Sequence, residues 1–325
     1  MATTRISDII VPEKFTGYTV QNTMQTSALF RSGVAVTNQA MAQQLRAGAA
    51  MFNVPYWLDL GDEEADVVSD DPNVLSTPKN IKGGKQLIRK AFLHQSWSAM
   101  NLASELAGAD ALQRIESRVS EYWTRQAEKR LLASISGIVD DNIANDNGDM
   151  VHDASTETID AMNVIDAAGT MGDVIGEIKA IGMHSKLYTS LLKQDLIDYI
   201  RDSNGSLVMS TYRGMAVIVD DALTPDASGV YTSVLFGSGS VGYATASPLI
   251  APGTEIENKP DAGNGGGQQI LHSRINLAMH PLGFTWKETA VAGDSPTIAE
   301  LTNPLNWDRI VERKAVPMAF LLTKG

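Results

Sequence analysis

Hydrophobic and polar positions divide the chain into segments of different character. Residues 1–50 are polar with scattered apolar side chains, and they predict an extended arm with one short helix near residues 38–47. Between residues 51 and 97, two strand-like stretches, about 51–60 and 86–95, flank a long polar middle. Neither the arm nor this hairpin can bury enough apolar surface of its own to be stable alone. Both segments are therefore expected to lie against another surface.

The clearest periodicity in the chain predicts a long helix. Asp110 followed by Gln113 is typical of a helix N-terminus. Charged side chains fill most of the polar positions, and Glu121 and Arg125 form a favourable i,i+4 pair. A helix over residues 111–136 would be about 39 Å long, a rod rather than an ordinary globular helix. The apolar side chains that recur every three or four residues are Leu112, Ile115, Val119, Tyr122, Trp123, Leu131, Ile135 and Ile138.

Shorter elements surround this helix. A helix beginning near Trp97 is expected to end at Gly108, and the polar residues 140–156 predict a connector at a domain boundary. Beyond the connector the pattern indicates a more compact α/β region. Its expected elements are helices at 157–168 and 171–180, a short strand, a helix over 185–200 that Ser185 caps, strands at 212–220, 230–237 and 241–246, then a strand, a glycine-rich loop at 261–267 and a long strand.

Composition is that of a folded protein rather than a disordered one. Hydrophobic residues make up 43% of the 325 residues and charged residues 20%. No apolar run is long enough to span a membrane, and the first residues lack the pattern of a signal peptide, so we expect synthesis in the cytosol. The absence of cysteine excludes disulfides and thiolate metal sites.

The charge balance is acidic. Asp and Glu number 38 against 26 Lys and Arg, which gives a net charge of −12. A protein that grips phosphates over an extended surface needs a basic patch. Specific binding of nucleic acid is therefore not expected, although a wall that encloses nucleic acid tolerates mild repulsion.

Charges in the hairpin at residues 51–97 are sorted along the chain. Seven acidic residues come between positions 59 and 71, and the residues from 79 to 90 carry five basic side chains and no acidic one. One hypothesis is a solvated flexible loop. The other is a projecting hairpin that lies on a neighbouring subunit and pairs its charges between copies. The candidate inter-subunit residues are Asp59, Asp62, Glu63, Glu64, Asp66, Lys79, Lys82 and Lys85.

One stretch of the sequence has the spacing of a cofactor motif. Gly237, Gly239 and Gly242 have the Gly-x-Gly-x-x-Gly spacing of a dinucleotide site, but the residues after them contain Pro248 and Pro252 and do not predict the helix that such a site requires. The glycines instead predict a turn between strands. No histidine has a second histidine at ligand spacing along the sequence, and no nucleophile elbow occurs. We therefore predict no catalytic residue, metal or cofactor.

Several stretches, in order, resemble major capsid proteins of tailed bacteriophages with the Hong Kong 97-like fold. They are FNVPYW at 52–57, SWSAMNLASELAGAD at 96–110, the helix at 115–137, GMHSKLY at 182–188, YRGMAVIVDD at 212–221, LFGSGSVGYA at 235–244 and MHPLGFTW at 279–286. The resemblance covers nearly the whole chain after residue 50. It implies an α+β fold and a structural subunit that self-assembles into the pentamers and hexamers of an icosahedral head around double-stranded DNA.

The resemblance also implies a domain organisation and partners. Residues 1–50 would be the N-arm, 51–97 the E-loop, 98–156 with 256–300 the P-domain, and 157–255 with 301–325 the A-domain. The P-domain would hold the spine helix at about 111–137 and a long strand at about 267–290. Implied partners are further copies of the chain, scaffold, portal and decoration proteins, in a virion that assembles in the host cytoplasm.

The sequence is compatible with two alternative functions. An encapsulin-type shell shares the fold and carries enzyme cargo, and a dinucleotide-dependent enzyme would be built on residues 230–257. Some relatives crosslink lysine to asparagine, and Lys79, Lys82 and Lys85 lie in the corresponding loop, but nothing in the sequence indicates that they react.

Overall fold

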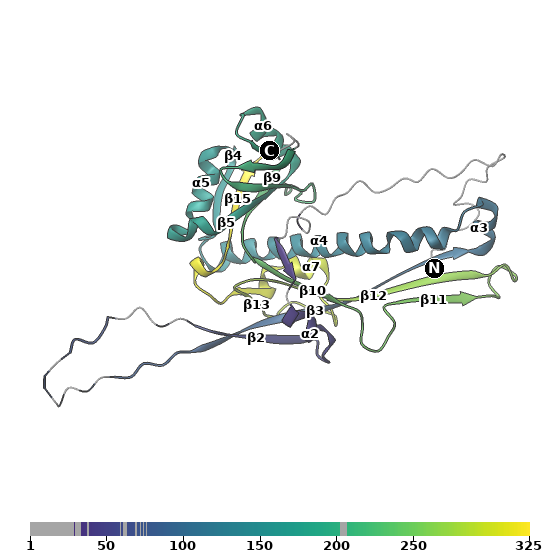
Figure 1. Ribbon diagram of the computed structural model, residues 1–325, viewed down its shortest axis with the longest axis horizontal. Coiled ribbons are helices and arrows are strands. Elements are labelled where there is room, and N and C mark those ends of the chain that lie inside the picture. Colours follow the sequence, from purple (N-terminus) through teal and green to yellow (C-terminus); the bar gives the residue numbers. More distant parts are fainter. Residues whose placement is uncertain are drawn as a thin grey trace.

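A computed structural model describes residues 29, 34–37, 39–58, 60, 64–68, 70–71, 73, 75, 77–201 and 207–325, and it has an α+β architecture (Figure 1). The helices are α2 (Gln39–Arg46), α3 (Asn101–Ala107), α4 (Ala111–Asn145), α5 (Ala161–Gly169), α6 (Ser185–Lys193) and α7 (Ile298–Thr302), with short 3₁₀ helices η2 (Gly172–Glu177), η3 (Pro304–Asn306) and η4 (Arg313–Ala315). The strands are β1 (Ala35–Thr37), β2 (Met51–Trp57), β3 (Gly83–Met100), β4 (Val151–Thr158), β5 (Ile178–Met183), β6 (Asp198–Arg201), β7 (Leu207–Tyr212), β8 (Met215–Val219), β9 (Val230–Gly237), β10 (Val241–Ala246), β11 (Thr254–Lys259), β12 (Gln268–Pro281), β13 (Phe284–Trp286), β14 (Trp307–Arg309) and β15 (Met318–Lys324).

A long sheet forms one half of the molecule. Its strands are ordered β1-β10-β12-β3-β2, and β11 extends it by pairing with β12. β3 and β12 run antiparallel in unbroken register from Lys90 opposite Ala278 to Met100 opposite Gln268. The helix α4 lies along this sheet (Figure 1), where Trp123 donates from Nε1 to Ser273 Oγ at 2.8 Å. The rod-like helix and the long strands therefore stiffen each other.

A second, more compact sheet has the order β4-β15-β9-β5-β8-β7-β6. β15, at the end of the chain, pairs parallel to β4 and antiparallel to β9, so it lies inside the sheet rather than at its edge. Ala319 and Leu321 on β15 join a buried cluster with Leu187 and Leu191 of α6. The chain forms strands β4 to β9 of the compact sheet, passes through β10 to β12 of the long sheet, and returns to the compact sheet with β15. The two halves of the molecule are therefore connected by α4 and by the chain that leads to β15.

The sheets divide the chain differently from the expected domains. β10 lies within the range 157–255 expected for the A-domain, yet it hydrogen-bonds to β12 in the long sheet. β4, expected as a connector, belongs to the compact sheet. Gly239, with φ of +70°, forms the turn after β9 at which the chain passes from the compact sheet to the long one. The predicted turn is confirmed, but it joins strands of two different sheets.

The long helix begins where predicted and ends later. The Asp110 carboxylate accepts hydrogen bonds from the backbone N–H groups of Leu112 and Gln113, which confirms it as the N-cap. The helix continues to Asn145 instead of ending near residue 137. Asn142 explains the difference, since its buried side chain accepts from Met150 N–H and donates to Asp149 and so fixes the turn that follows the helix. The first polar residues of the expected connector are therefore helical, because their side chains have specific hydrogen-bond partners.

Several shorter elements also differ from expectation. β3 continues to Met100, so α3 begins later than predicted. Residues 171–180 form η2 and then strand rather than helix, and α6 ends at Lys193 because β6 follows. The cap of α6 is His184, whose Nδ1 accepts from Lys186 N–H at 3.0 Å, and not Ser185. The long strand expected at 267–290 is β12 and β13, with a turn at Gly283, whose φ is +91°.

Asp141 in the last turns of α4 is a buried acid, and it allows a prediction. Burial raises the pKa of its carboxyl, and the nearby Asp146 and Asp308 raise it further, while the hydrogen bond from Asn145 lowers it. Its Oδ2 has no hydrogen-bond partner among the described residues. The folded state therefore binds the proton more tightly than the unfolded state, so ionisation near neutral pH costs stability.

The variant Asp141→Asn is expected to raise the free energy of unfolding at pH 7, because it removes the charge whose burial raises the pKa of the carboxyl. The gain should shrink as the pH falls below neutral, because the wild-type carboxyl then takes up its proton more readily than an ordinary aspartate. Urea denaturation of the unassembled chain at several pH values measures both effects. A gain that stays constant with pH would show that the removed charge is not its cause.

Candidate assembly surfaces

The hairpin formed by β2 and β3 projects away from the body of the molecule (Figure 1). The two strands pair from Met51 opposite Arg89 to Trp57 opposite Gly83, and Leu58 N–H donates to the Lys82 carbonyl. Beyond that pair, the described residues up to Thr77 belong to no helix or strand. In the described part of this segment, residues 58–82 contribute no side chain to a hydrophobic core cluster of their own subunit.

The base of the hairpin is fixed to the body of the protein. Tyr56 donates from its hydroxyl to the Ile310 carbonyl at 3.2 Å, and Leu87 N–H donates to Thr285 Oγ1 at 3.0 Å. The Arg89 guanidinium lies 3.0 Å from Glu288 and donates to the Asp294 carbonyl at 2.9 Å. The direction in which the hairpin leaves the body is therefore set by the fold.

The predicted contact residues of the hairpin lie at its surface as far as they are described. Glu64, Asp66, Lys79, Lys82 and Lys85 are exposed. Within the described ranges, Glu64, Asp66, Lys82 and Lys85 form no ion pair inside their own subunit. The remaining three candidates, Asp59, Asp62 and Glu63, lie outside the described residues.

Sequence reasoning missed that the hairpin is also apolar. Val68 is 96% exposed, Val67 87%, Leu75 83% and Trp57 73%. Such side chains, grouped on one projecting segment, are typical of a surface that a partner covers. In the sequence, the adjacent valines Val67 and Val68 were a sign of this apolar surface. They stand next to acidic residues, so the segment was interpreted from its charges instead.

The glycine run at Gly237, Gly239 and Gly242 builds no dinucleotide site. Gly237 ends β9, and its N–H donates to the Pro317 carbonyl at 2.7 Å. Gly242 lies within β10, where an added Cβ would approach Met41 Sδ at 3.0 Å. A strand follows the turn where a dinucleotide site needs a helix N-terminus.

The fold brings two histidines together that are far apart in sequence. His94 Nε2 lies 3.1 Å from His272 Nδ1, and His272 Nε2 lies 3.3 Å from Glu257. Burial, followed by the charges of His272 and Arg274, lowers the pKa of His94. The sequence could not reveal this pair, because the register of β3 against β12 alone makes them neighbours. In the part of the chain that is described, no group of three or more His, Asp or Glu side chains is arranged to hold a metal ion.

His280 and Asp220 have structural roles. His280 is buried, and its Nε2–H donates to the Phe284 carbonyl at 2.6 Å; burial lowers its pKa to about 4, although this hydrogen bond acts in the opposite direction. Asp220 is buried, and its Oδ1 accepts from Ala222 N–H. It caps the turn after β8.

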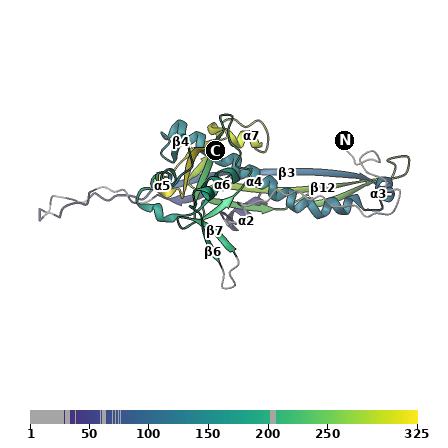
Figure 2. The ribbon, with the colours of Figure 1, turned by 90° about the horizontal axis from the view of Figure 1, so that it is seen from above.

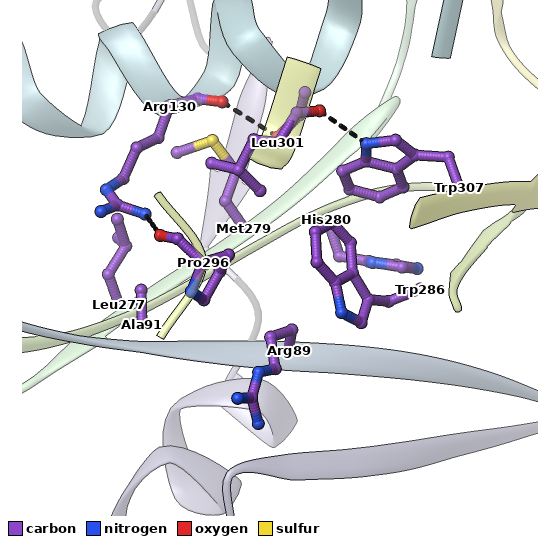
Figure 3. Close-up of a pocket in the computed structure, with 11 residues that line it drawn as sticks. Arg89, Ala91, Arg130, Leu277, Met279, His280, Trp286, Pro296, Leu301 and Trp307 are labelled. Carbon is purple, nitrogen blue, oxygen red and sulfur yellow. Dashed lines mark hydrogen bonds between the residues drawn. The ribbon is translucent and has the colours of Figure 1, made fainter. Parts of the chain in front are cut away.

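A small cavity between α4 and the long sheet is part of the core (Figure 3). Its volume is about 20 Å³, which suits a single water rather than a substrate. Arg130 donates to the Pro296 carbonyl at 2.8 Å, and Trp307 donates to the Leu301 carbonyl at 2.8 Å. The rings of Trp286 and Trp307 meet edge to face, with centroids 5.0 Å apart. These side chains fasten the C-terminal segment to α4.

Comparison with known protein families shows to which family the chain belongs. Residues 93–316 match the family model described as major capsid protein 13-like, Gp13-like. The chain is also 36% identical over 323 residues to the major capsid protein of Bacillus phage SPP1, covering 97% of both chains. The chain belongs to this major capsid protein family. It is a structural component of a virion capsid, and the family is not an enzyme family.

Solved capsid structures share the fold at low sequence identity. The chain in the capsid of cyanophage Pam1 aligns with a TM-score of 0.63 at 9% identity, over 96% of both chains. The capsid of Helicobacter pylori bacteriophage KHP30 aligns with a TM-score of 0.56 at 13% identity, over 99% of this chain and 97% of that one. The Hong Kong 97-like fold expected from the sequence agrees with these neighbours. Within the described ranges, no helix has the length and apolar character needed to cross a bilayer.

Proposed function

We propose that this capsid protein assembles into the pentamers and hexamers of an icosahedral head that encloses double-stranded DNA. The observation that carries the proposal is its similarity to a phage capsid protein over 97% of both chains. This similarity favours a phage head over an encapsulin-type compartment. The net charge of −12 suits a wall that surrounds DNA without binding its sequence.

The elements correspond to parts of a capsid subunit. α4 and β12 would belong to the P-domain, with α4 as its spine helix, and the compact sheet with α5 and α6 would form the A-domain near the capsomer axes. Residues 1–50 would serve as the N-arm and residues 51–97 as the E-loop. Scaffold, portal and decoration proteins are the further partners of such a subunit.

The hairpin is proposed to lie on a neighbouring subunit. Its exposed valines would bury apolar area there, while its acidic and basic stretches would face opposite charges on adjacent copies and set the register. The candidate residues are Asp59, Asp62, Glu63, Glu64, Asp66, Lys79, Lys82 and Lys85. A symmetric shell repeats this contact for every subunit.

Electron microscopy of the expressed chain, alone and with its scaffold, tests the proposed function. Closed shells, or isolated pentamers and hexamers, are expected. A monomer that stays monodisperse under both conditions, with an ordered hairpin over residues 59–85, would count against it.

Reversal of three charges in the hairpin gives a specific prediction. The combined variant Lys79→Glu, Lys82→Glu and Lys85→Glu is expected to lose shell formation while its thermal unfolding stays near that of the wild-type chain, because these side chains are exposed in the single subunit. Electron microscopy and sedimentation measure assembly, and circular dichroism measures the fold.

Two matched variants test whether charge pairing is the cause. Replacing the same lysines by arginine keeps the charge and should preserve shells. Adding Glu64→Lys and Asp66→Lys to the triple reversal should restore part of the assembly. Normal shells from the triple reversal would show that the hairpin does not rely on these charges.

A further inference from the structure

Three polar side chains form a diagonal row across the outer part of the long sheet. They come from neighbouring strands, with Glu257 on β11, His272 on β12 and His94 on β3. The register places Ser96 opposite His272, so His94 is the diagonal neighbour two residues away. Figure 2 shows β3 and β12 running side by side toward α3. The two imidazoles are therefore held by strands in unbroken register.

This row lies on the face of the sheet that points away from α4. Ser273 accepts a hydrogen bond from Trp123 of α4, so the adjacent His272 lies on the opposite face. The side chain of His272 is 22% exposed and that of Glu257 is 47% exposed, and His94 is exposed as well. Solvent and dissolved ions can therefore reach both imidazoles.

Hydrogen bonds assign the proton on each ring nitrogen. His272 Nε2 lies 3.3 Å from the Glu257 carboxylate, which can only accept, so Nε2 carries the proton and Nδ1 keeps a lone pair. This hydrogen bond lowers the pKa of Glu257, which keeps the carboxylate ionised. The Nδ1 lone pair of His272 faces His94 Nε2 at 3.1 Å, so His94 donates. Because burial lowers the pKa of His94, its ring is neutral at pH 7.

The spacing of the two rings matches that of two ligands of one metal ion. Imidazole nitrogens that bind a metal at about 2.0–2.1 Å lie about 2.9–3.4 Å apart when the bond angle is between square-planar and tetrahedral. His94 Nε2 and His272 Nδ1 are 3.1 Å apart. Metal-binding histidines also donate their second N–H to a carboxylate in most sites, and Glu257 has this position behind His272.

We propose that His94 and His272 form a surface site for a divalent late first-row transition metal ion, with Glu257 orienting His272. Water completes the coordination, since no third protein ligand is arranged there among the described residues. Imidazole suits Cu²⁺, Ni²⁺ and Zn²⁺ rather than Mg²⁺ or Ca²⁺, and Cu²⁺ binds most tightly of these. On binding, His94 Nε2 releases its proton to solvent and Nδ1 takes one up, so the ring stays neutral. The inference does not depend on shell assembly.

The charges around the site do not oppose a cation. Arg274 lies opposite His94 in the register, but its guanidinium is 3.0 Å from Glu255. Lys259 is likewise 3.5 Å from Glu257. Both cationic side chains are thus paired with carboxylates of β11.

A bound ion would stabilise the folded chain. It would join β3 to β12 through two ligands 178 positions apart in sequence. Because the unfolded chain does not hold these ligands together, binding should raise the melting temperature as the metal concentration rises.

Titration of the full chain with CuCl₂ and ZnCl₂ tests the site. Calorimetry should show one ion per chain, with Cu²⁺ bound more tightly than Zn²⁺, and the electron paramagnetic resonance of the copper form should show two imidazole nitrogens. Glu257→Gln should weaken binding about tenfold, the usual effect of a residue that orients a ligand. His94→Gln and His272→Gln should each weaken it further and leave one nitrogen in the copper spectrum.

His152→Gln, on β4 of the compact sheet, is the matched control and should bind as the wild-type chain does. Binding should weaken below about pH 6, where protons compete for the imidazoles.

Thermal unfolding separates loss of the site from loss of the fold. Without metal, His94→Gln and the wild-type chain should melt at similar temperatures, and ZnCl₂ should raise only that of the wild type. The site would be overturned by absence of binding at equimolar metal, by equal affinity of the wild type and His94→Gln, or by full binding in the variant that combines His94→Gln with His272→Gln.

Discussion

Replacing Gly137 by alanine is expected to destabilise the subunit by about 3 kcal/mol or more, the upper range for an overpacked core. Gly137 lies on the face of α4 that meets the C-terminal segment. A Cβ there would collide with the Leu301 carbonyl oxygen and lie 2.7 Å from Trp307 Nε1. These two atoms form a buried hydrogen bond of 2.8 Å, so neither can move without breaking it.

Gly169, at the end of α5, is the matched control for this prediction. An added Cβ at Gly169 meets no atom within 4 Å. Gly169→Ala should therefore be neutral or stabilising by up to about 1 kcal/mol, because alanine restricts the unfolded chain. Urea denaturation of both variants measures the difference. Equal stability of Gly137→Ala and the wild-type chain would mean that α4 and α7 can separate freely, contrary to the packing described.

Removal of the Arg313 side chain is the second large effect, with an expected loss of about 2–4 kcal/mol for the variant Arg313→Met. The guanidinium joins three segments that meet beside the compact sheet. It donates to the Asp149 carbonyl before β4, to Thr170 Oγ1 after α5, and to the Val316 carbonyl before β15. Burial lowers its pKa to about 10, with the Asp149 carboxylate acting in the opposite direction, so the group stays charged at neutral pH.

The cost arises because methionine fills part of the volume but leaves these acceptors without a donor. Arg313→Lys keeps the charge and should recover only part of the stability, since an ammonium cannot reach three acceptors in a planar fork. Lys314→Met, at the next position, removes an exposed ion pair with Asp173 and should change little. Thermal unfolding compares the three variants, and a similar melting temperature for Arg313→Met and Lys314→Met would contradict this role of Arg313.

Local signals in the sequence predicted individual elements well where the side chains act locally. Asp110 identified the start of α4 because an N-cap needs only its own side chain and the next three backbone N–H groups. Gly108, with φ of +65°, identified the end of α3 for the same reason. The end of α4 was missed because Asn142 is polar yet buried, and its partners follow the helix.

The candidate surfaces were predicted in part. The hairpin and its sorted charges are visible in the sequence, since seven acidic residues precede a basic stretch. Its exposed valines could not be recognised, because whether Val67 and Val68 are covered depends on what the fold places beside them. Likewise, the family resemblance predicted a capsid subunit, while the strand partners of β3 are visible only in the structure.

The sequence by itself determined the periodicity of α4, its cap, the turn at Gly239 and the acidic balance, because these depend on neighbouring residues or on composition. The tertiary structure alone decided which sheet each strand joins and the contact between His94 and His272. The physical reason is that strand pairing is non-local. Hydrogen bonds between β3 and β12 join residues more than 160 positions apart, and no local preference encodes their register.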